Sequence, residues 1–413
     1  MFLDLLRRRN PDFLRAAAQL HRSGELPANC YAIDLDAVRR NAAAIAAEAA
    51  RLGLSAFAMT KQLGRNPDVS RALAEEGITH AVGVDLQDAE ADAAGGLRIG
   101  HLGHLVQIPR SEAARGAALA PSFWTVFNET KAAEAAAASA AAGREQALLA
   151  RIVADGDRFY RGHEGGFDAA DVVRVADRLD GLTGGRFAGV TTFPAMLFDS
   201  DARTVRPTPN LATLQVAVER LRRAGRADVA VNGPGTTSAA TLPMLAEAGV
   251  TQVEPGHGLT GTTPWHAVED LVEEPAVAYV SEVSHTYGGG AYVFGGGLYV
   301  DPVLGGTATR AVVVGDGADP ATAPTLPVEM PAPEAIDYYA IVDASDGPSV
   351  EVGDTVVFGF RAQVFVTRAL TAAIAGVSTG RPHVVGVWAA DGSLPQHLSP
   401  DTSNVLADRR RNP

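Results

Sequence analysis

The stretch "LSAFAMTKQLGRNPDVSRALAEEG" (54–77) contains the structural unit from which much of this chain is built. It begins with a short run of small and apolar residues, continues through a Gly/Asn/Pro turn, and ends in an amphipathic segment. Short, nearly continuous apolar runs are typical of parallel strands covered on both faces, and amphipathic segments are typical of the helices that cover them. A single lysine, Lys61, stands where the predicted strand ends, and a buried cation there would need a partner or a function.

The same strand–turn–helix pattern repeats eight times between residues 54 and 258. Leu211 and Leu214 begin the apolar stripe of one predicted helix, and Asn128 is a suitable N-cap for an Ala-rich helix over 129–142. Eight such units predict a (β/α)8 TIM barrel rather than an open doubly wound sheet, and no GxGxxG motif follows the first strand. The predicted barrel strands are 55–60, 80–84, 98–103, 122–127, 148–153, 186–193, 228–232 and 251–255.

The pattern changes after residue 265, where strand-like segments alternate with Gly, Pro and Asp turns, as in an all-β domain. We therefore expect an N-terminal helix, strand and lead-in helix over 1–50, the barrel over 51–265, and a C-terminal β-domain over 266–413. The strand "CYAIDL" (30–35) is compatible with either domain, and the proline-rich segment 324–335 is expected to be a surface loop. The strand-like segments of the β-domain are 276–284, 291–300, 309–316, 337–344, 354–366 and 383–392.

The composition of the 413 residues narrows the class of protein. A formal net charge of −13 argues against a nucleic acid or an anionic membrane as the partner. The single cysteine, Cys30, excludes an intrachain disulfide and a cysteine-based metal cluster, which suits a reducing cytoplasm. The start of the chain lacks the apolar core of a signal peptide, so we expect a cytoplasmic protein.

In a barrel, Lys61 lies at the carboxyl-terminal mouth, where TIM-barrel enzymes place their chemistry. The pKa of a partly desolvated ammonium falls, and its neutral amine becomes a nucleophile. A salt bridge at the rim of the barrel is the structural alternative for this lysine.

A Gly-rich turn follows the predicted seventh strand, in "VNGPGTTSAATLPML" (231–245). Glycine amides, hydroxyl groups and a following helix N-terminus together bind anions, and TIM barrels commonly bind phosphate after strands 7 and 8. The candidate ligands in this turn are Asn232, Gly233, Gly235, Thr236 and Thr237.

The predicted eighth strand ends in "VEPGHGLTG" (253–261), which places Glu254 at the mouth, with Gly256 and His257 beside it. A lysine after strand 1, an anion-binding turn after strand 7 and a carboxylate on strand 8 suit a phosphorylated aldehyde with a basic ring nitrogen. Pyridoxal 5′-phosphate fits: an imine to Lys61, the phosphate on the 233–238 turn, and the pyridine nitrogen on Glu254.

Two segments resemble the alanine racemase-like, fold-type III pyridoxal phosphate enzymes. "AMTKQLGRNPDVSRALAEEG" (58–77) is similar to their cofactor-lysine segment, and "NGPGTTSAATLPMLAEAGVTQVEPGHGLTG" (232–261) is similar to their segment from the phosphate turn to strand 8. The resemblance covers nearly the whole chain and is closest to the YhfX-type branch. It implies an alanine racemase-like fold and a head-to-tail homodimer in which the partner's β-domain completes the active site.

One residue departs from the alanine racemase pattern. Those enzymes place an arginine opposite the pyridine nitrogen, whereas this chain has Glu254, and its "EPG" is similar to the "EPGR" of the fold-type III decarboxylases. A carboxylate keeps the nitrogen protonated and so supports a quinonoid carbanion, which would form on the substrate imine after transimination releases Lys61 from its internal aldimine. Decarboxylation or elimination is therefore the alternative to racemisation, although the cysteine that the decarboxylases use late in the β-domain is missing. His257 replaces their arginine and is expected to contact the phosphate.

Racemisation needs an acid/base on each face of the substrate. Lys61 would serve one face, and the resemblance points to a tyrosine early in the β-domain for the other. Tyr292 matches best by spacing, with His285 and Tyr287 as alternatives. In "DGDRFYRGHEGGF" (155–167), His163 is the candidate for a contact with the cofactor ring.

His101 and His104 lie on and just after the predicted third strand. Three residues apart on a strand, they are expected to face opposite ways, so we assign them a structural role and predict no metal site. A metal-dependent barrel hydrolase is disfavoured because its His-x-His at the end of strand 1 is absent. The sequence therefore predicts a dimeric pyridoxal phosphate enzyme, an amino-acid racemase first and a decarboxylase or lyase second; a non-catalytic cofactor-homeostasis protein is the third alternative.

Overall fold

The computed structural model describes residues 1–395 apart from 296–297, 300–308, 316, 331–337, 346, 348 and 365–366. Its contacts divide the chain into two compact units. The barrel unit comprises residues 37–60 and 70–275, and the β unit comprises residues 1–36, 61–69 and the chain from 276 onward.

Eight parallel strands form the barrel unit, in the sheet order β2-β12-β11-β8-β6-β5-β4-β3. A bridge between Ala58 and Ala81 joins the first strand to β3, and Ala58 N donates to His80 O at 2.8 Å, so the sheet closes on itself. The predicted barrel is confirmed. Its strands are β2 (Ser55–Ala56), β3 (His80–Gly83), β4 (Arg98–Leu102), β5 (Phe123–Val126), β6 (Gln146–Val153), β8 (Gly185–Thr191), β11 (Ala230–Asn232) and β12 (Gln252–Val253).

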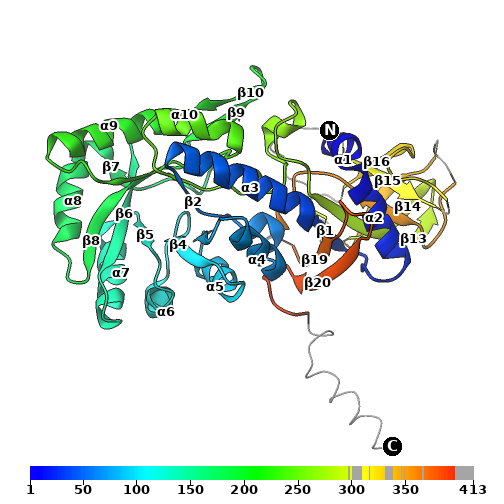
Figure 1. Ribbon diagram of the computed structural model, residues 1–413, viewed down its shortest axis with the longest axis horizontal. Helices are drawn as coiled ribbons and strands as arrows, with labels where there is room; N and C mark the ends of the chain where they lie inside the picture. Colours follow the sequence, from blue (N-terminus) through cyan, green and yellow to red (C-terminus); the bar gives the residue numbers. More distant parts are fainter. Residues whose placement is uncertain are drawn as a thin grey trace, which may run out of the picture. The chain divides into compact units, whose positions relative to one another are not determined.

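Helices alternate with these strands along the chain, and Figure 1 shows α7, α8 and α9 on the outside of the sheet. The Ala-rich helix begins as expected, because Asn128 Oδ1 accepts a hydrogen bond from Lys131 N at 2.9 Å. Leu211 and Leu214 are buried, as the stripe on their helix predicts. The helices are α3 (Leu35–Leu52), α4 (Pro67–Glu75), α5 (Leu86–Ala94), α6 (Ala113–Ala118), α7 (Glu129–Ala141), α8 (Val172–Asp180), α9 (Pro209–Arg223) and α10 (Leu242–Glu247). Three short strands lie outside the barrel path: β7 (Phe167–Asp168), β9 (Met196–Asp199) and β10 (Thr204–Pro207).

The β unit is built on a second closed sheet, in which β13, β14, β17, β16, β15 and β18 pair antiparallel and β18 returns to β13. β1 pairs antiparallel with β13 and parallel with β19, which places the N-terminal strand in this unit. Leu3 and Leu14 belong to the core that its two N-terminal helices form against the strands. Its elements are α1 (Phe2–Arg9), α2 (Pro11–Arg22), β1 (Cys30–Asp34), β13 (Val277–Tyr287), β14 (Gly290–Phe294), β15 (Arg310–Val314), β16 (Thr325–Glu329), β17 (Tyr339–Asp343), β18 (Thr355–Phe358), β19 (Leu370–Ala375) and β20 (His383–Ala389).

In the β unit one expectation was wrong and one strand was missed. The expected loop 324–335 begins with strand β16, and residues 331–335 of it lie outside the described residues. Strand β19 was not predicted, because its sequence "LTAAIA" is rich in alanine, which favours helix. In both cases pairing with a neighbouring strand outweighs the local preference.

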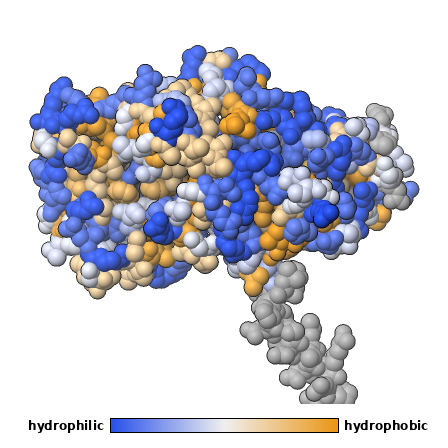
Figure 2. Space-filling view, viewed as in Figure 1, coloured by the Kyte–Doolittle hydropathy of each residue, from blue (hydrophilic) through white to orange (hydrophobic). Residues whose placement is uncertain are grey.

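None of the helices in the described part of the chain is long and apolar enough to cross a bilayer. Figure 2 shows hydrophilic residues spread over the visible face, interrupted by smaller hydrophobic patches.

Candidate active site

Six polar side chains belong to one inward-facing layer near the carboxyl ends of the barrel strands. Strand pairing fixes this layer: Arg151 lies opposite Thr191, and Thr191 lies opposite Asn232. Directly paired residues of parallel strands point to the same face, and so do residues two apart on one strand. The face is the inner one because His101 of β4 and Glu254, directly after β12, meet across it, although β4 and β12 are not neighbours in the sheet. The members of this polar layer are His101, Thr125, Arg151, Thr191, Asn232 and Glu254.

Hydrogen bonds connect five members of the polar layer. The His101 ring contacts Thr125 Oγ1 through Nε2 and Glu254 Oε1 through Nδ1, the latter at 2.5 Å. Asn232 Nδ2 donates to the same Glu254 oxygen at 3.0 Å, and its Oδ1 accepts from Thr191 Oγ1 at 2.7 Å. All five side chains are buried. The network therefore fixes the position of one carboxylate in a site removed from water.

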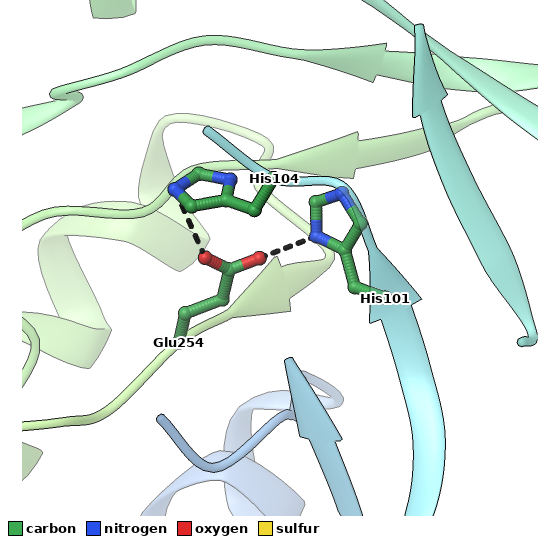
Figure 3. A group of neighbouring side chains, drawn as sticks. All are labelled: His101, His104 and Glu254. Carbon is green, nitrogen blue, oxygen red and sulfur yellow. Dashed lines mark hydrogen bonds and ion pairs between the residues drawn. The ribbon is translucent and has the colours of Figure 1, made fainter. Parts of the chain in front are cut away.

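A second histidine approaches the same carboxylate. His104 Nε2 lies 3.4 Å from Glu254 Oε2, and Figure 3 shows both histidines pointing at the two carboxylate oxygens. The expectation that His101 and His104 face opposite ways was wrong. β4 ends at Leu102, and Gly103 adopts φ +75°, a left-handed conformation that breaks the alternation of a strand and turns His104 inward.

Glu254 is a carboxylate despite its burial. Burial alone would raise its pKa, but positive charge on His104 and His101 and hydrogen bonds from His101 and Asn232 outweigh it and hold the pKa below the ordinary value. This acceptor lies directly after β12 at the mouth of the barrel. It is suited to keep a proton on a neighbouring basic nitrogen.

The turn after β11 presents two buried hydroxyl groups. Thr237 and Ser238 are 3% and 1% exposed. Their hydroxyl oxygens have no hydrogen-bond partner among the residues that the structure describes. A Cβ on Gly258 would lie 2.4 Å from Thr237 O, so only glycine lets the turn after β12 pack this closely on the turn after β11. Buried hydroxyls without partners suit a bound oxyanion.

Five other predicted residues of these turns have defined backbone hydrogen bonds or conformations. The Gly233 N–H donates to Gln252 O at 3.0 Å, and Gly235 has φ +128°. Thr236 also has a positive φ, of 42°. After β12, the Gly256 carbonyl accepts from Leu259 N at 2.9 Å, and buried His257 accepts from Thr262 N through its carbonyl at 2.9 Å.

Lys61 is the first residue after the barrel segment that ends at Thr60. That segment is anchored at the mouth: Met59 N donates to Pro255 O at 2.9 Å, and Thr60 Oγ1 donates to Asp92 Oδ1 at 2.5 Å. The strand end before the lysine is therefore hydrogen-bonded to Pro255, the residue that follows Glu254.

His163 lies in the loop after β6, where its ring packs against Phe193 at a centroid distance of 5.9 Å. The ring of His104 packs against the same Phe193 at 5.5 Å. The sequence-predicted His163 is thus brought to the aromatic ring that also contacts His104.

The predicted acid/base residues of the β unit lie together on one pair of strands. The rings of His285 and Tyr292 stack at 4.5 Å with an interplanar angle of 14°, and Tyr339 meets His285 edge-on at 5.2 Å. Tyr287 is 76% exposed.

Arg151 is a candidate that the sequence analysis missed. It is 1% exposed, its Nη2 donates to His163 O, and its guanidinium lies 4.6 Å from the ring centroid of Phe127. Nε and Nη1 have no hydrogen-bond partner among the described residues, and burial, opposed by Glu164, lowers the pKa of Arg151 to about 10. The signal was present in the sequence: a charged residue within the apolar run "LLARIV" (148–153).

The chain matches two family models and one relative over nearly its full length. The family model described as alanine racemase, N-terminal domain, matches residues 33–264, and the YhfX-like C-terminal domain matches residues 278–384. Protein YhfX of Escherichia coli (strain K12) is 36% identical over 393 residues, which cover 95% of this chain and 99% of that protein.

Two solved structures share the fold at low identity. D-threonine aldolase from Filomicrobium marinum has a TM-score of 0.66 at 18% identity, covering 89% of this chain and 95% of that one. Alanine racemase of Clostridium difficile 630 in complex with cycloserine has a TM-score of 0.62 at 14% identity, covering 87% and 98%.

Proposed function

Since the chain belongs to the alanine racemase-like family and carries its YhfX-like C-terminal domain, we propose that it is a pyridoxal 5′-phosphate enzyme acting at the α-carbon of an amino acid. Among the possible reactions we place racemisation first. The observation that carries the proposal is the buried Glu254 carboxylate. The residue that follows it, Pro255, accepts a backbone hydrogen bond from Met59, two residues before Lys61.

The residues present fit this cofactor. The unpartnered hydroxyls of Thr237 and Ser238 would donate to its phosphate, beside the amides of Gly235 and Thr236. His257, on the adjacent turn, is the further candidate for the phosphate. When bound, pyridoxal phosphate supplies an aldehyde for a lysine amine and an electron-withdrawing ring that makes the α-proton of an attached amino acid acidic.

Glu254 would keep a proton on the ring nitrogen. Its Oε1 is held by His101 and Asn232, and the lowered pKa keeps the group ionised near neutral pH. A fixed anion in a dry site attracts a positive N–H more strongly than the same anion in water. The polar layer therefore positions the acceptor before any ligand arrives.

Proton transfer would use one residue on each face of the substrate. Lys61 would move the α-proton on one face, and Tyr292 on the other, with His285 and Tyr287 as alternatives. The stack of His285 on Tyr292 restricts the tyrosine ring. We propose that this pair serves the barrel of a second copy in a head-to-tail homodimer, and that His163 contacts the cofactor ring.

Arg151 supplies a cation in the same layer as Glu254. A buried guanidinium whose Nε and Nη1 have no hydrogen-bond partner among the described residues favours an acidic group on the ligand, and a substrate carboxylate provides one.

The chain offers an unusually clean test, because it contains only two lysines, Lys61 and Lys131. The protein saturated with pyridoxal phosphate should show an imine band near ~420 nm that borohydride abolishes, with the label on the Lys61 peptide. Lys61→Ala should lose the band. Lys131→Ala is the matched control, since Lys131 lies on α7 and pairs with Glu134 at 2.8 Å. A label on Lys131, or an unchanged band in Lys61→Ala, contradicts the proposal.

A decarboxylase or lyase is the second candidate, favoured by the carboxylate at position 254. Incubation with a panel of amino acids in D2O separates the reactions. Loss of chirality with deuterium at Cα identifies a racemase, whereas an amine, keto acid or aldehyde product identifies the alternative. Cofactor uptake without any exchange or product identifies a non-catalytic binding protein.

A further inference from the structure

We propose that His101, His104 and Glu254 form a binding site for a divalent transition metal ion, with Zn²⁺ as the probe, and that this ion and the cofactor ring nitrogen exclude one another. The metal site stands on the geometry alone. The exclusion rests on the proposed function, because it requires that Glu254 also receive the ring nitrogen.

The three side chains supply a ligand set that such ions prefer. Two imidazoles and one carboxylate bind zinc in catalytic centres and iron in facial triads. One ligand atom from each residue lies within 4.8 Å of the others, and the side chains are 0–1% exposed. The 3.4 Å between His104 Nε2 and Glu254 Oε2 matches the edge of a tetrahedron around zinc, about 3.3 Å for bonds of about 2.0–2.1 Å.

The surroundings of the cluster resemble the outer shell of a metal centre. His101 contacts Thr125 Oγ1 through its second ring nitrogen, and Asn232 donates to Glu254 Oε1 at 3.0 Å. His104 is braced by the ring of Phe193 at 5.5 Å. Partners of this kind fix the orientation of metal ligands and their protonation.

Metal binding requires one proton shift, which the structure accommodates. Nδ1 of His101 now shares a hydrogen with Glu254 Oε1 at 2.5 Å. To coordinate through Nδ1, the neutral ring places its proton on Nε2 and donates it to Thr125 Oγ1, a hydroxyl that accepts as readily as it donates. The ion replaces this hydrogen bond, and the two atoms must separate from 2.5 Å to about 3.3 Å to act as ligands of one zinc ion.

The charge in the cluster favours a cation. The described partners of Glu254 are two imidazole rings and one neutral amide, with no lysine or arginine among them. A protonated ring nitrogen or a metal ion would supply a counter-charge to this carboxylate. Both use the same carboxylate, so the occupation of one excludes the other.

The first test is a titration of the cofactor-free protein with Zn²⁺, followed by calorimetry and metal analysis, with Co²⁺ absorbance reporting the coordination. Wild type should bind one ion per chain. His104→Gln and His101→Gln should each lose more than the roughly 10–100-fold in affinity that loss of an outer-shell partner costs, and Thr125→Val should fall within that range. Circular dichroism melts establish that each variant is folded.

His80→Gln is the matched control, because His80 is a partly buried histidine at the amino end of β3 in the same unit. It should bind Zn²⁺ as the wild type does. The metal site is refuted if the folded His104→Gln variant binds Zn²⁺ as tightly as the wild type, or if the wild type binds none.

The second test concerns exclusion. Protein loaded with Zn²⁺ is mixed with pyridoxal phosphate, and the imine band is followed before and after EDTA. We expect little band until the chelator is added. Full uptake of the cofactor with zinc retained overturns the exclusion. Failure to take up cofactor even without zinc contradicts the proposed function instead, and the zinc titration still decides the metal site.

Discussion

The polar layer of the barrel and the aromatic face of the β unit (His285, Tyr292, Phe294 and Tyr339) organise candidate functional groups in opposite ways. In the polar layer, hydrogen bonds from several strands fix buried side chains. On the aromatic face, rings stack on one another while Phe294 and Tyr339 stay 37% and 38% exposed. The polar layer is complete within one chain, whereas the aromatic face presents its groups outward. Changes in the first should therefore affect stability and ligand uptake, and changes in the second should affect turnover.

The largest expected effect comes from the aromatic face. Tyr292→Phe removes the hydroxyl of the proposed acid/base and should lower kcat by about 10²–10⁴-fold. Cofactor uptake and melting temperature should stay at their wild-type values, because the hydroxyl is absent from the cofactor-binding set. Steady-state racemisation and the imine absorbance measure the two quantities. A fall in cofactor uptake would show that the two regions are not separable in this way.

Glu254→Ala tests the polar layer. The substitution leaves the donors of His101 and Asn232 unsatisfied in a buried site, which costs roughly 1–3 kcal/mol for each such group. Urea unfolding should therefore show a loss of stability, together with loss of the imine band. Glu247→Ala, at the end of α10 in the same unit, is the control and should change stability little. Wild-type stability for Glu254→Ala would mean that the layer contributes nothing to the fold.

The lowered pKa of Glu254 predicts an acid-sensitive contribution to stability. A carboxyl with a lower pKa in the folded than in the unfolded chain stabilises the fold above its unfolded pKa, near about 4.3. That contribution is lost as the pH falls through the folded pKa. The difference in unfolding free energy between wild type and Glu254→Gln should therefore shrink from pH 7 to pH 3. A difference that stays constant would contradict the assigned direction.

Arg151 is the member of the polar layer whose partner we place on the ligand. Arg151→Met should leave stability unchanged or slightly raised, because it removes a buried charge whose Nε and Nη1 have no hydrogen-bond partner among the described residues. It should raise KM for an amino acid by about 10-fold or more, the equivalent of one charge-assisted hydrogen bond of about 1.5–3 kcal/mol. Binding of the matching amine, which lacks the carboxylate, should not change. Arg186→Met is the control, since Arg186 faces Glu145 at the surface.

The smallest expected effect comes from a residue that belongs to neither region. Asn128→Ala removes the N-cap of α7 and should cost about 1 kcal/mol without altering cofactor uptake. Thermal melting and imine absorbance measure it. A change in uptake would show that the helix transmits strain to the site.

The sequence predicted the barrel well because its signals are local. Each strand is a short apolar run bounded by turn residues, and all eight were located near their observed positions. β19 escaped prediction because it pairs with β1, which is distant in sequence, and β16 was missed because it lies in a proline-rich segment although its partners β15 and β17 are its neighbours along the chain. Local patterns therefore suffice where each element carries its own signal.

The same contrast applies to the candidate site. Glu254, Asn232 and Thr237 were proposed as site residues because they end or follow strands at the mouth, and their roles stay predictions. His101 and His104 were misjudged because one left-handed glycine and a contact across the closed barrel decide where they point. Neither is visible in the spacing of the two residues.

The position of β1 constrains how this protein is made. Residues 30–34 pair with β13 and β19. During synthesis this early strand therefore has no partner until the whole barrel sequence, which lies between β1 and β13, has been made. On the ribosome the barrel can close while the N-terminal helices still lack most of their sheet. A chain cut near residue 265 would deprive β1 of both neighbours, so separate expression of the two halves should yield an aggregation-prone N-terminal fragment.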